Sequence, residues 1–426
     1  MLIKKMMILL GYFLTTTLFP VVMGTGLHSF KKKKLVLLQC KGGYGHVAAC
    51  NALNNIFKDY YDIKIVTPIE ELFDEFDIIK KMTRGKANSE DMYNGILQRG
   101  WIRTFNVVCD NIVPFVVRFN YKKMEKALAA YLNREKPDML ISTMPFVNFP
   151  ASNVAKNLNI PFLIVTVDGG LHNWRVGLKD ISHSNYLITI GFDIPQTRGF
   201  LHQCAIPDEK IRLTGFAVRN DFFELKDVKA IRKKWAIPDN KFTTMILMGG
   251  AGGATAFDYV QKIVSADIDS HVLVCIGRNK KLQTKIARFM QKKSPSNVSV
   301  TIIPFTERVS DLMAVSDLLI TKPGPGSISE ALTMKLPMLL DYTKPALFWE
   351  RPNMEYVKNN GYGLVIKSLR HVPGILQKMR DDKEYYQGFK QKLEQSSQYN
   401  FAQNIKPIVF SMCPPTLPEV NFQLSG

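Results

Sequence analysis

Two successive runs of short apolar segments that alternate with helical segments constrain the fold of this chain more than any other feature. The first run starts at LVLLQC (residues 35–40) and continues through IKIVTPI, DMLISTM and FLIVTV to IRLTGF. The second run starts at TTMILMGG, after a charged stretch at residues 225–241, and continues through HVLVCIG, VSVTIIP and DLLIT to PMLLDY. Strands that alternate with helices are typical of parallel sheets. The sequence therefore predicts an α/β protein with two doubly wound, Rossmann-like domains whose strand ends face a ligand-binding cleft.

This pattern divides the chain into four expected parts. They are a hydrophobic N-terminal segment (1–30), a first Rossmann-like domain (31–220), a second Rossmann-like domain (221–380) and a C-terminal helical tail (381–426).

The first thirty residues allow three interpretations. An apolar run at residues 6–24 follows Lys4 and Lys5 and precedes the four lysines 31–34. The run resembles a signal peptide, is long enough for a short membrane anchor, and is not translated at all if synthesis starts at Met23. Since more lysines follow the run than precede it, the positive-inside tendency favours a membrane-associated protein whose main body is cytoplasmic.

The charge balance points to an anionic partner. The chain has 56 Lys and Arg against 37 Asp and Glu, a formal net charge of +19. Nucleic acid, anionic lipid and phosphorylated metabolites all suit this charge. Because the sequence contains neither an RNP-type aromatic motif nor zinc-finger spacing, we expect no nucleic acid partner. The six cysteines are scattered and form no metal-binding or disulfide pattern, which is typical of a reduced, cytosolic protein.

Two glycine-rich turns in the second half are candidate phosphate sites. In Pro323-Gly324-Pro325-Gly326-Ser327 the glycines let backbone N–H groups approach a ligand at the start of a helix, where the helix dipole attracts anions. Ser327 and Glu330 also have the spacing of a capping box, which needs no ligand. Gly249 and Gly250 open a second turn of this kind, and neither turn matches the P-loop pattern.

The first half has its own glycine-rich turn. Gly42, Gly43 and Gly45 precede His46 at the start of a helix, where the helix dipole disfavours a protonated imidazole and leaves a neutral base near pH 7. Asp168 ends the apolar segment FLIVTVD. Each side chain also has an ordinary structural interpretation, as a core histidine and as a cap of the following turn.

Together these turns resemble those of the GT-B glycosyltransferases of family 28, and above all those of the diacylglycerol glycosyltransferase branch. The resemblance covers roughly residues 35–365. The matching segments are GGYGH (42–46), KPDMLISTMPF, IPFLIVTVD, LTGFAVR, LMGGAGG, IGRNKKL, PFTERVSDLMAVSDLLITKPGPGSISEAL (304–332) and NMEYVKNNGYG (353–363).

The resemblance implies that residues 31–220 bind the acceptor and the membrane and that residues 221–380 bind the UDP-sugar. It also implies a role for each motif. It makes His46 the first choice for the catalytic base, with Asp168 as the second choice or its partner. The residues implied in donor binding are Gly249, Gly250, Arg278, Phe305, Thr306, Gly324, Pro325, Gly326, Ser327, Glu330, Glu350 and Asn353. Among these, residues 324–327 would hold the diphosphate of a UDP-sugar. Glu330 would bind the ribose hydroxyls, and Phe305 and Thr306 would lie near the uracil. The acceptor loops would contain Gly42, Gly43, Gly45, His172 and Trp174.

Three departures from the family pattern stand out. Tyr44 and Gly45 precede His46 where the family usually has a third glycine alone, and Trp174 lies one residue early after Asp168. Trp349 replaces a glutamine that contacts the sugar in related enzymes. The identity of the donor sugar is therefore left open.

The implied function is inverting transfer of a hexose from UDP-glucose or UDP-galactose to a lipid hydroxyl, with diacylglycerol as the expected acceptor. The UDP-sugar is a substrate, and we expect no cofactor and no metal, since the second half contains no Asp-x-Asp motif. The alternatives are N-acetylglucosaminyl transfer to a polyprenyl-linked acceptor, a UDP-sugar 2-epimerase, and a non-catalytic nucleotide-sugar-binding protein.

Residues 80–136 suit an anionic membrane surface. They contain twelve basic and five acidic residues, interleaved with the apolar segments GWIRTFNVV and VPFVVRFNY. Such a mixture is typical of segments that lie at a membrane interface, and it is nearly as typical of a solvated helical face around core aromatics.

Overall fold

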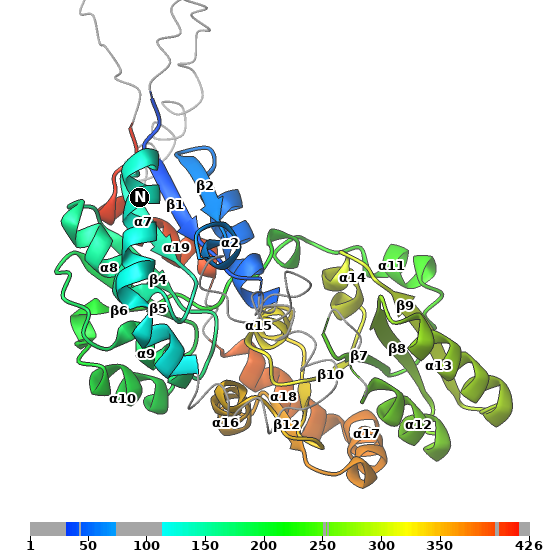
Figure 1. Cartoon of the computed structure of the whole chain (residues 1–426). Helices are drawn as coiled ribbons and strands as arrows, with labels where there is room; N and C mark the ends of the chain where they lie inside the picture. The colour runs from blue at the N-terminus through cyan, green and yellow to red at the C-terminus, as the bar shows by residue number, and fades with distance from the viewer. Residues whose placement is uncertain are drawn as a thin grey trace, which may run out of the picture. The chain divides into compact units, whose positions relative to one another are not determined.

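The computed structural model describes residues 31–41, 44–73, 113–249, 253, 255–396 and 400–416 (Figure 1). Within them, Lys33–Pro415 belong to one compact unit that contains two six-stranded sheets. Every strand pair in both sheets is parallel. The predicted α/β class with two doubly wound sheets is therefore confirmed. The segment 1–30 and the basic residues 80–112 lie outside the described residues.

The first sheet has the order β2-β1-β3-β4-β5-β6. Its strands are β1 (Lys34–Leu38), β2 (Asp62–Val66), β3 (Met139–Ser142), β4 (Phe162–Val165), β5 (Tyr186–Ile190) and β6 (Ile211–Leu213). The chain adds β2 on one side of β1 and β3 on the other, so the strand order reverses there. Ligands of open parallel sheets bind at such a switch point, outside the carboxyl ends of the strands.

The second sheet has the order β12-β11-β10-β7-β8-β9. Its strands are β7 (Thr243–Leu247), β8 (Ser270–Gly277), β9 (Val298–Pro304), β10 (Leu318–Thr321), β11 (Met338–Asp341) and β12 (Gly363–Ile366). Here the order reverses between β7 and β10. The two glycine-rich turns noted in the sequence follow these two strands, and so lie at the switch point of the second sheet.

Helices connect the strands and cover the sheets. In the first half they are α2 (Tyr44–Phe57), α3 (Pro68–Glu71), α7 (Tyr121–Glu135), α8 (Asn148–Asn157), α9 (Arg175–Leu178) and α10 (Pro195–Gln203). The second half has α11 (Val228–Lys234), α12 (Ala256–Ala266), α13 (Lys280–Lys293), α14 (Val309–Ala314), α15 (Pro325–Thr333), α16 (Arg351–Asn359), α17 (Val372–Asp381) and α18 (Lys383–Glu394), and the chain ends with α19 (Phe401–Met412). Short 3-10 helices are η2 (His172–Trp174), η3 (Asp208–Lys210), η4 (Asn220–Phe222), η5 (Phe348–Glu350) and η6 (Leu369–His371). No helix among the described residues is long and apolar enough to cross a membrane.

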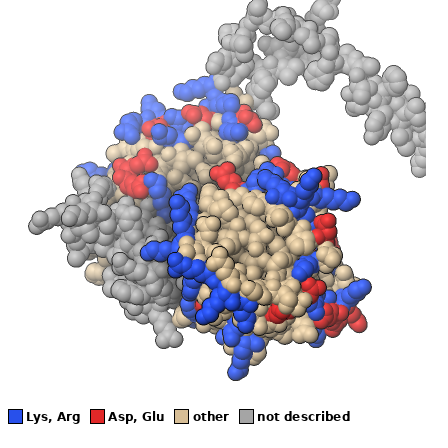
Figure 2. Space-filling model, turned by 90° about the vertical axis from the view of Figure 1, so that its right-hand side faces the viewer, with Lys and Arg blue, Asp and Glu red and all other residues tan. Residues whose placement is uncertain are grey.

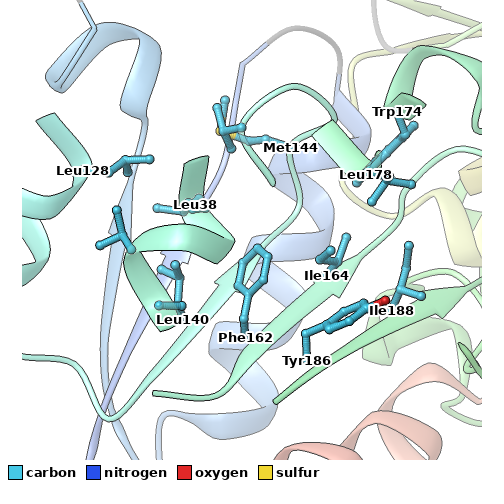
Figure 3. Close-up of a cluster of buried hydrophobic side chains, with 14 of the residues drawn as sticks. Leu38, Leu128, Leu140, Met144, Phe162, Ile164, Trp174, Leu178, Tyr186 and Ile188 are labelled. Carbon is cyan, nitrogen blue, oxygen red and sulfur yellow. The ribbon is translucent and has the colours of Figure 1, made fainter. Parts of the chain in front are cut away.

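Apolar side chains on both faces of the central strands explain why these segments form a parallel sheet. All four residues of β3 and all four of β4 are buried. Figure 3 shows part of the core on one face of the first sheet, where Leu140, Phe162 and Ile164 lie with Trp174 and Leu178. A strand that is buried on both faces reads as a continuous apolar run, which is why these strands were recognisable in the sequence.

The last helix returns to the first sheet. Phe401, Ile405 and Val409 of α19 are buried in one cluster with Leu35 of β1 and Phe57 of α2. By contrast, α18 packs against the second half, where its Leu393 is buried. The residues expected as a C-terminal tail thus contribute to both halves, while the expected domain boundaries stay predictions.

Candidate active site

The carboxyl ends of β1, β3 and β4 bring the predicted catalytic residues of the first half together. His46 lies in the first turn of α2, which follows β1, while Thr143 follows β3 and Asp168 follows β4. Since β1 pairs with β3, and β3 with β4, these three strand ends are adjacent. Electrostatic interaction between His46 and Asp168 follows from this arrangement.

The hydrogen bond of His46 fixes its tautomer. The side chain is buried, and Nδ1 lies 2.6 Å from the carbonyl oxygen of Thr143. Because a carbonyl oxygen only accepts hydrogen bonds, Nδ1 carries the proton and Nε2 of the neutral ring keeps its lone pair. Burial lowers the pKa of His46 below its ordinary value of 6.5, against the opposing effects of Asp168 and of the Thr143 hydrogen bond. The ring is therefore a neutral base at pH 7.

Two N–H donors hold one oxygen of Asp168. Trp174 Nε1 donates to Oδ2 at 2.9 Å, and Asn173 Nδ2 donates to the same oxygen at 3.2 Å. Trp174 is fully buried in the core of the first half. The loop that departs from the family pattern therefore places an indole N–H directly on the carboxylate. His172 of the same short helix is exposed and lies 5.3 Å from the ring of Phe200, between ring centroids.

In the second sheet, the two glycine-rich turns meet around one lysine. Gly249 follows β7 with φ +87°, a conformation that favours glycine, and a Cβ there would lie 3.4 Å from Lys322 Cε. A Cβ on Gly324 would lie 3.8 Å from both Lys322 Cε and Glu350 Oε1. Lys322 Nζ also lies 3.9 Å from Glu350 Oε1. A half-exposed ammonium group thus stands between a glycine turn and the N-terminus of α15.

The start of α15 overturns one interpretation of the sequence. Gly324 is the N-cap and Pro325 the first helical residue, and no side chain caps the helix. Ser327 is therefore already inside the first turn, and the Ser327–Glu330 spacing does not form a capping box. Proline favours the first helical position because its fixed φ suits a helix and its missing N–H is not needed there. The backbone N–H groups at this helix start are consequently not used by a side-chain cap.

The remaining donor-binding candidates follow neighbouring strands at the same edge. Arg278 follows β8, with its guanidinium carbon 4.5 Å from the ring centroid of Phe305, which follows β9. Phe305 stays exposed, and Thr306 Oγ1 accepts the backbone N–H of Arg308 at 3.0 Å. The strand pairs β10–β7, β7–β8 and β8–β9 make these ends contiguous. The structure thus gathers these candidates along one edge of the second sheet.

Glu330 lies one and a half turns into α15 and has an unusual protonation equilibrium. Burial raises its pKa to about 7, while the charge of Arg219 opposes this rise and that of Asp221 adds to it. Arg219 itself donates to the carbonyl oxygen of Glu307 at 2.8 Å. Near neutral pH this carboxyl group is therefore poised between its neutral and its charged form.

A seam of close contacts joins the two sets of strand ends. The backbone N–H of Gly170 donates to the carbonyl oxygen of Trp349 at 2.8 Å. A Cβ on Gly169 would lie only 1.7 Å from Asn353 Oδ1, so any other residue there would displace the Asn353 side chain. Asn353 is fully buried and donates to the carbonyl oxygen of Pro323 at 2.9 Å. The seam therefore holds Asp168 of the first half next to the donor-binding candidates of the second.

Charge also crosses the seam. Glu350 is buried, and burial raises its pKa, an effect that Lys322 opposes and Asp168 reinforces. Among the described residues, no group of three or more His, Cys, Asp or Glu side chains is arranged to hold a metal ion. The arrangement provides a neutral base, a fixed carboxylate and a set of backbone N–H groups with one lysine.

Several predicted residues are not placed with these. Gly42, Gly43 and Gly250 lie outside the described residues, and Gly45 lies in the first turn of α2 beside Val167. The roles of all candidates stay predictions. Sequence reasoning missed Lys322, although it directly precedes the Pro-Gly pair, and Thr143, whose backbone oxygen carries no recognisable motif.

Comparison with known proteins identifies the second half. Residues 244–405 match the model of the glycosyltransferase family 28 C-terminal domain. The match covers every strand of the second sheet except the first residue of β7, and it covers both glycine-rich turns.

Several curated proteins that resemble the chain carry the same name. A processive diacylglycerol beta-glucosyltransferase from Staphylococcus carnosus is 25% identical over 364 residues, which are 83% of this chain and 86% of the relative. The protein of the same name from Staphylococcus haemolyticus is 31% identical over 249 residues, which are 58% of this chain and 60% of the relative.

Solved structures show the same fold at low identity. MurG from Acinetobacter baumannii superposes with a TM-score of 0.57 at 15% identity, covering 89% of this chain and 99% of that one. The UDP-GlcNAc 2-epimerase from Neisseria meningitidis gives a TM-score of 0.56 at 16% identity, with the same coverage. At such identities the likeness shows the GT-B architecture alone. The sequence matches are more specific: residues 244–405 match the C-terminal domain of glycosyltransferase family 28, and the chain is similar over most of its length to a diacylglycerol glucosyltransferase.

Proposed function

We propose that this protein transfers glucose from UDP-glucose to the hydroxyl group of diacylglycerol, with inversion at the anomeric carbon. The observation that carries the proposal is the similarity to relatives named processive diacylglycerol beta-glucosyltransferase, one of which is matched over 86% of its length. Their names favour glucose over galactose. The geometry of the two strand edges is consistent with such a transfer.

The donor is proposed to bind at the edge of the second sheet. Its diphosphate would accept hydrogen bonds from backbone N–H groups at the start of α15 and would form an ion pair with Lys322. Anions are stabilised at helix N-termini, and charge-assisted hydrogen bonds are stronger than neutral ones. As the sugar leaves, negative charge grows on the diphosphate, and these donors stabilise it without rearranging. The proposal assigns this task to the protein's own groups, so activity is expected to persist in the presence of a chelator.

The acceptor is proposed to be activated by His46. Nε2 removes the proton of the lipid hydroxyl while its oxygen forms a bond to the anomeric carbon. The bond from that carbon to the phosphate oxygen breaks, and UDP leaves with the electron pair. General-base catalysis of this kind contributes about 10²- to 10⁴-fold.

Asp168 is proposed to stabilise the imidazolium that forms on His46. Its charge raises the pKa of His46, although burial has the larger effect and lowers it. With Oδ2 held by Trp174 and Asn173, the carboxylate keeps a fixed orientation through the reaction. It is therefore a positioning and electrostatic partner rather than the first base.

A lipid acceptor requires contact with a membrane, which we propose for the first half. Phe115 and Phe119 are one helical turn apart and are 73% and 77% exposed. Arg118 lies between them in the sequence and is exposed, as are Lys122 and Lys126 of the following helix α7. Apolar side chains among basic ones are typical of an interfacial contact with anionic lipid. We propose that the protein is membrane-associated, with its catalytic part on the cytoplasmic side.

The proposal is tested by incubating the purified full-length protein with UDP-glucose, UDP-galactose or UDP-GlcNAc, with and without dispersed diacylglycerol. Mass analysis of the lipids is expected to show hexosyl-diacylglycerol from UDP-glucose, with and without EDTA. A polyprenyl phosphate-linked acceptor and a lipid-free reaction serve as further arms. Epimerised nucleotide sugar without lipid, transfer only to the polyprenyl acceptor, or UDP binding without any product would each contradict the proposal.

A further inference from the structure

An exposed apolar cluster lies in the second half, outside the site described above. Of the seven large apolar side chains that are exposed among the described residues, three fall within six positions. Leu225 is 104% exposed, and Phe223 and Val228 are each 41% exposed. They lie between η4 and the first turn of α11, which packs beside α14 (Figure 1). Exposed apolar side chains that lie together are a feature of interaction sites, whereas single ones are common on any surface.

The frame beneath this cluster is fixed. Phe222 and Ile231, which flank it in the sequence, are both buried in the core of the second half. Asp227 caps α11 by accepting the backbone N–H of Ala230 at 3.0 Å. The apolar side chains are therefore presented from an ordered backbone.

The charges around the cluster are net positive: residues 223–233 contain four basic residues (Lys226, Lys229, Arg232 and Lys233) and two acidic ones (Glu224 and Asp227). Lys226 forms ion pairs with Glu224 and Asp311, at 3.4 Å each, which leaves these acidic groups occupied. Lys229 and Lys233 are exposed one helical turn apart on α11, and no carboxylate of the described residues forms an ion pair with them. Two unpaired ammonium groups consequently stand beside the apolar side chains. Lys and Arg also outnumber Asp and Glu on the face of the molecule drawn in Figure 2.

We propose that residues 223–233 form a second membrane contact, in which Phe223, Leu225 and Val228 enter the interface of an anionic bilayer and Lys229 and Lys233 bind its headgroups. Amphipathic surfaces with lysine beside large apolar side chains bind anionic membranes through burial of the apolar side chains and electrostatic attraction to the headgroups. A stable protein partner needs about 800 Å² of complementary surface on each side, more than three side chains supply. RNA-binding surfaces use stacked aromatic rings, whereas two of these three side chains are aliphatic.

This contact goes beyond the proposed function, because it belongs to the half that would bind the nucleotide. Arg219, whose charge acts on Glu330, lies four residues before Phe223. Membrane contact at residues 223–233 would thus hold the donor-binding half, as well as the first half, at the surface where the lipid acceptor resides.

The contact is tested with the full-length Leu225→Trp protein and vesicles of phosphatidylglycerol and phosphatidylcholine, without any UDP-sugar. Because the Leu225 side chain is fully exposed, the substitution leaves the core unchanged. After subtraction of the parent spectrum, tryptophan emission is expected to shift to shorter wavelength with vesicles and to be quenched by brominated lipid. This readout is local, so it reports on residue 225 even where another segment keeps the protein on the vesicle.

Charge variants in the Leu225→Trp background supply matched controls. Lys229→Glu with Lys233→Glu is expected to raise the lipid concentration for half-maximal shift by about tenfold or more, since each basic residue near an anionic surface contributes about 1 kcal/mol. Lys292→Glu with Lys293→Glu makes the same charge change at the end of α13 and is expected to leave the shift unchanged.

Three results would overturn the contact. The first is that vesicle-bound Leu225→Trp protein shows neither a shift nor quenching of the tryptophan emission. The second is that both pairs of Lys→Glu substitutions change the lipid concentration for half-maximal shift equally. The third is that an RNA oligonucleotide shifts the emission and vesicles do not. Since no sugar transfer is measured, the contact and the proposed function can fail independently of each other.

Discussion

A single hydrogen bond decides which nitrogen of His46 is available as a base. The carbonyl oxygen of Thr143 accepts a hydrogen bond from Nδ1–H, and burial keeps the ring neutral near pH 7. The sequence predicted the neutral histidine from its place at a helix start. The tautomer was not predictable, because it depends on a backbone oxygen that is distant in the sequence and identical in every residue type.

His46→Asn separates the hydrogen bond that His46 donates to Thr143 from its role as a base. Its side-chain N–H can still donate to Thr143, but the base is gone. We expect kcat to fall by about 10²- to 10⁴-fold, while the Kd for UDP measured by calorimetry stays within twofold of the parent value, about the error of such comparisons. In the parent protein, kcat is expected to fall with decreasing pH only below the ordinary histidine pKa of 6.5, because burial lowers the pKa of His46. An unchanged kcat in the variant would remove His46 from the mechanism.

Glu330 gives a second pH dependence, in binding. Its pKa is about 7, and its ionised form is the better acceptor for two ribose hydroxyls. The affinity for UDP is therefore expected to rise as pH increases through 7 and to weaken as pH falls below it. Calorimetric titration of UDP between pH 5.5 and 8.5 checks this. Glu330→Gln should remove the dependence near pH 7, and a variant that keeps both the affinity and the dependence would contradict the assignment.

At the scale of elements, glycine decides how closely the two strand edges approach. The turn after β4 meets the first turn of α16, with no space for a side chain at Gly169 unless Asn353 moves. The sequence showed two glycines after Asp168 but gave no sign of their partner, since Asn353 lies far away in the chain and its approach is a property of tertiary packing.

Gly169→Ala tests whether this approach matters for activity. A Cβ 1.7 Å from Asn353 Oδ1 must displace the buried Asn353 side chain, which donates to Pro323. We expect kcat/KM to fall by about tenfold or more, since small displacements of reacting groups carry large costs. The matched control is Gly199→Ala in α10, where a Cβ meets nothing within 4 Å. That change is expected to keep activity and to stabilise the helix by about 0.5–1 kcal/mol. Equal activity in both variants would show that the seam is not needed for catalysis.

At the scale of the whole molecule, the sequence predicted the two sheets but not how the end of the chain packs against them. Continuous apolar runs such as FLIV marked the buried strands, and glycine-rich turns marked the strand ends at the switch points. The path of the chain end was not predictable, because the amphipathic pattern of α19 states that it buries one face but not against which sheet. The structure places this face on the first sheet, beside Leu35 and Phe57.

Because α19 packs on the first sheet, the stability of the first half depends on the end of the chain. Ile405 of α19 is fully buried, and Ile405→Ala is expected to lower the free energy of unfolding by about 2–5 kcal/mol, as measured by urea denaturation. Gln403→Ala on the exposed face of the same helix is the control and is expected to change it by less than about 0.5 kcal/mol. Equal stability of the two variants would contradict the packing of α19 described above.

The central claim is that the edge of the second sheet binds the donor's diphosphate, and a crystal structure of the protein with UDP tests it most directly. We expect the phosphates within hydrogen-bond distance of the backbone N–H groups of Gly326 and Ser327 in the first turn of α15, with Lys322 Nζ beside them and the ribose on Glu330. A UDP molecule bound elsewhere in the protein, with residues 322–327 free of contact to phosphate, would contradict the account.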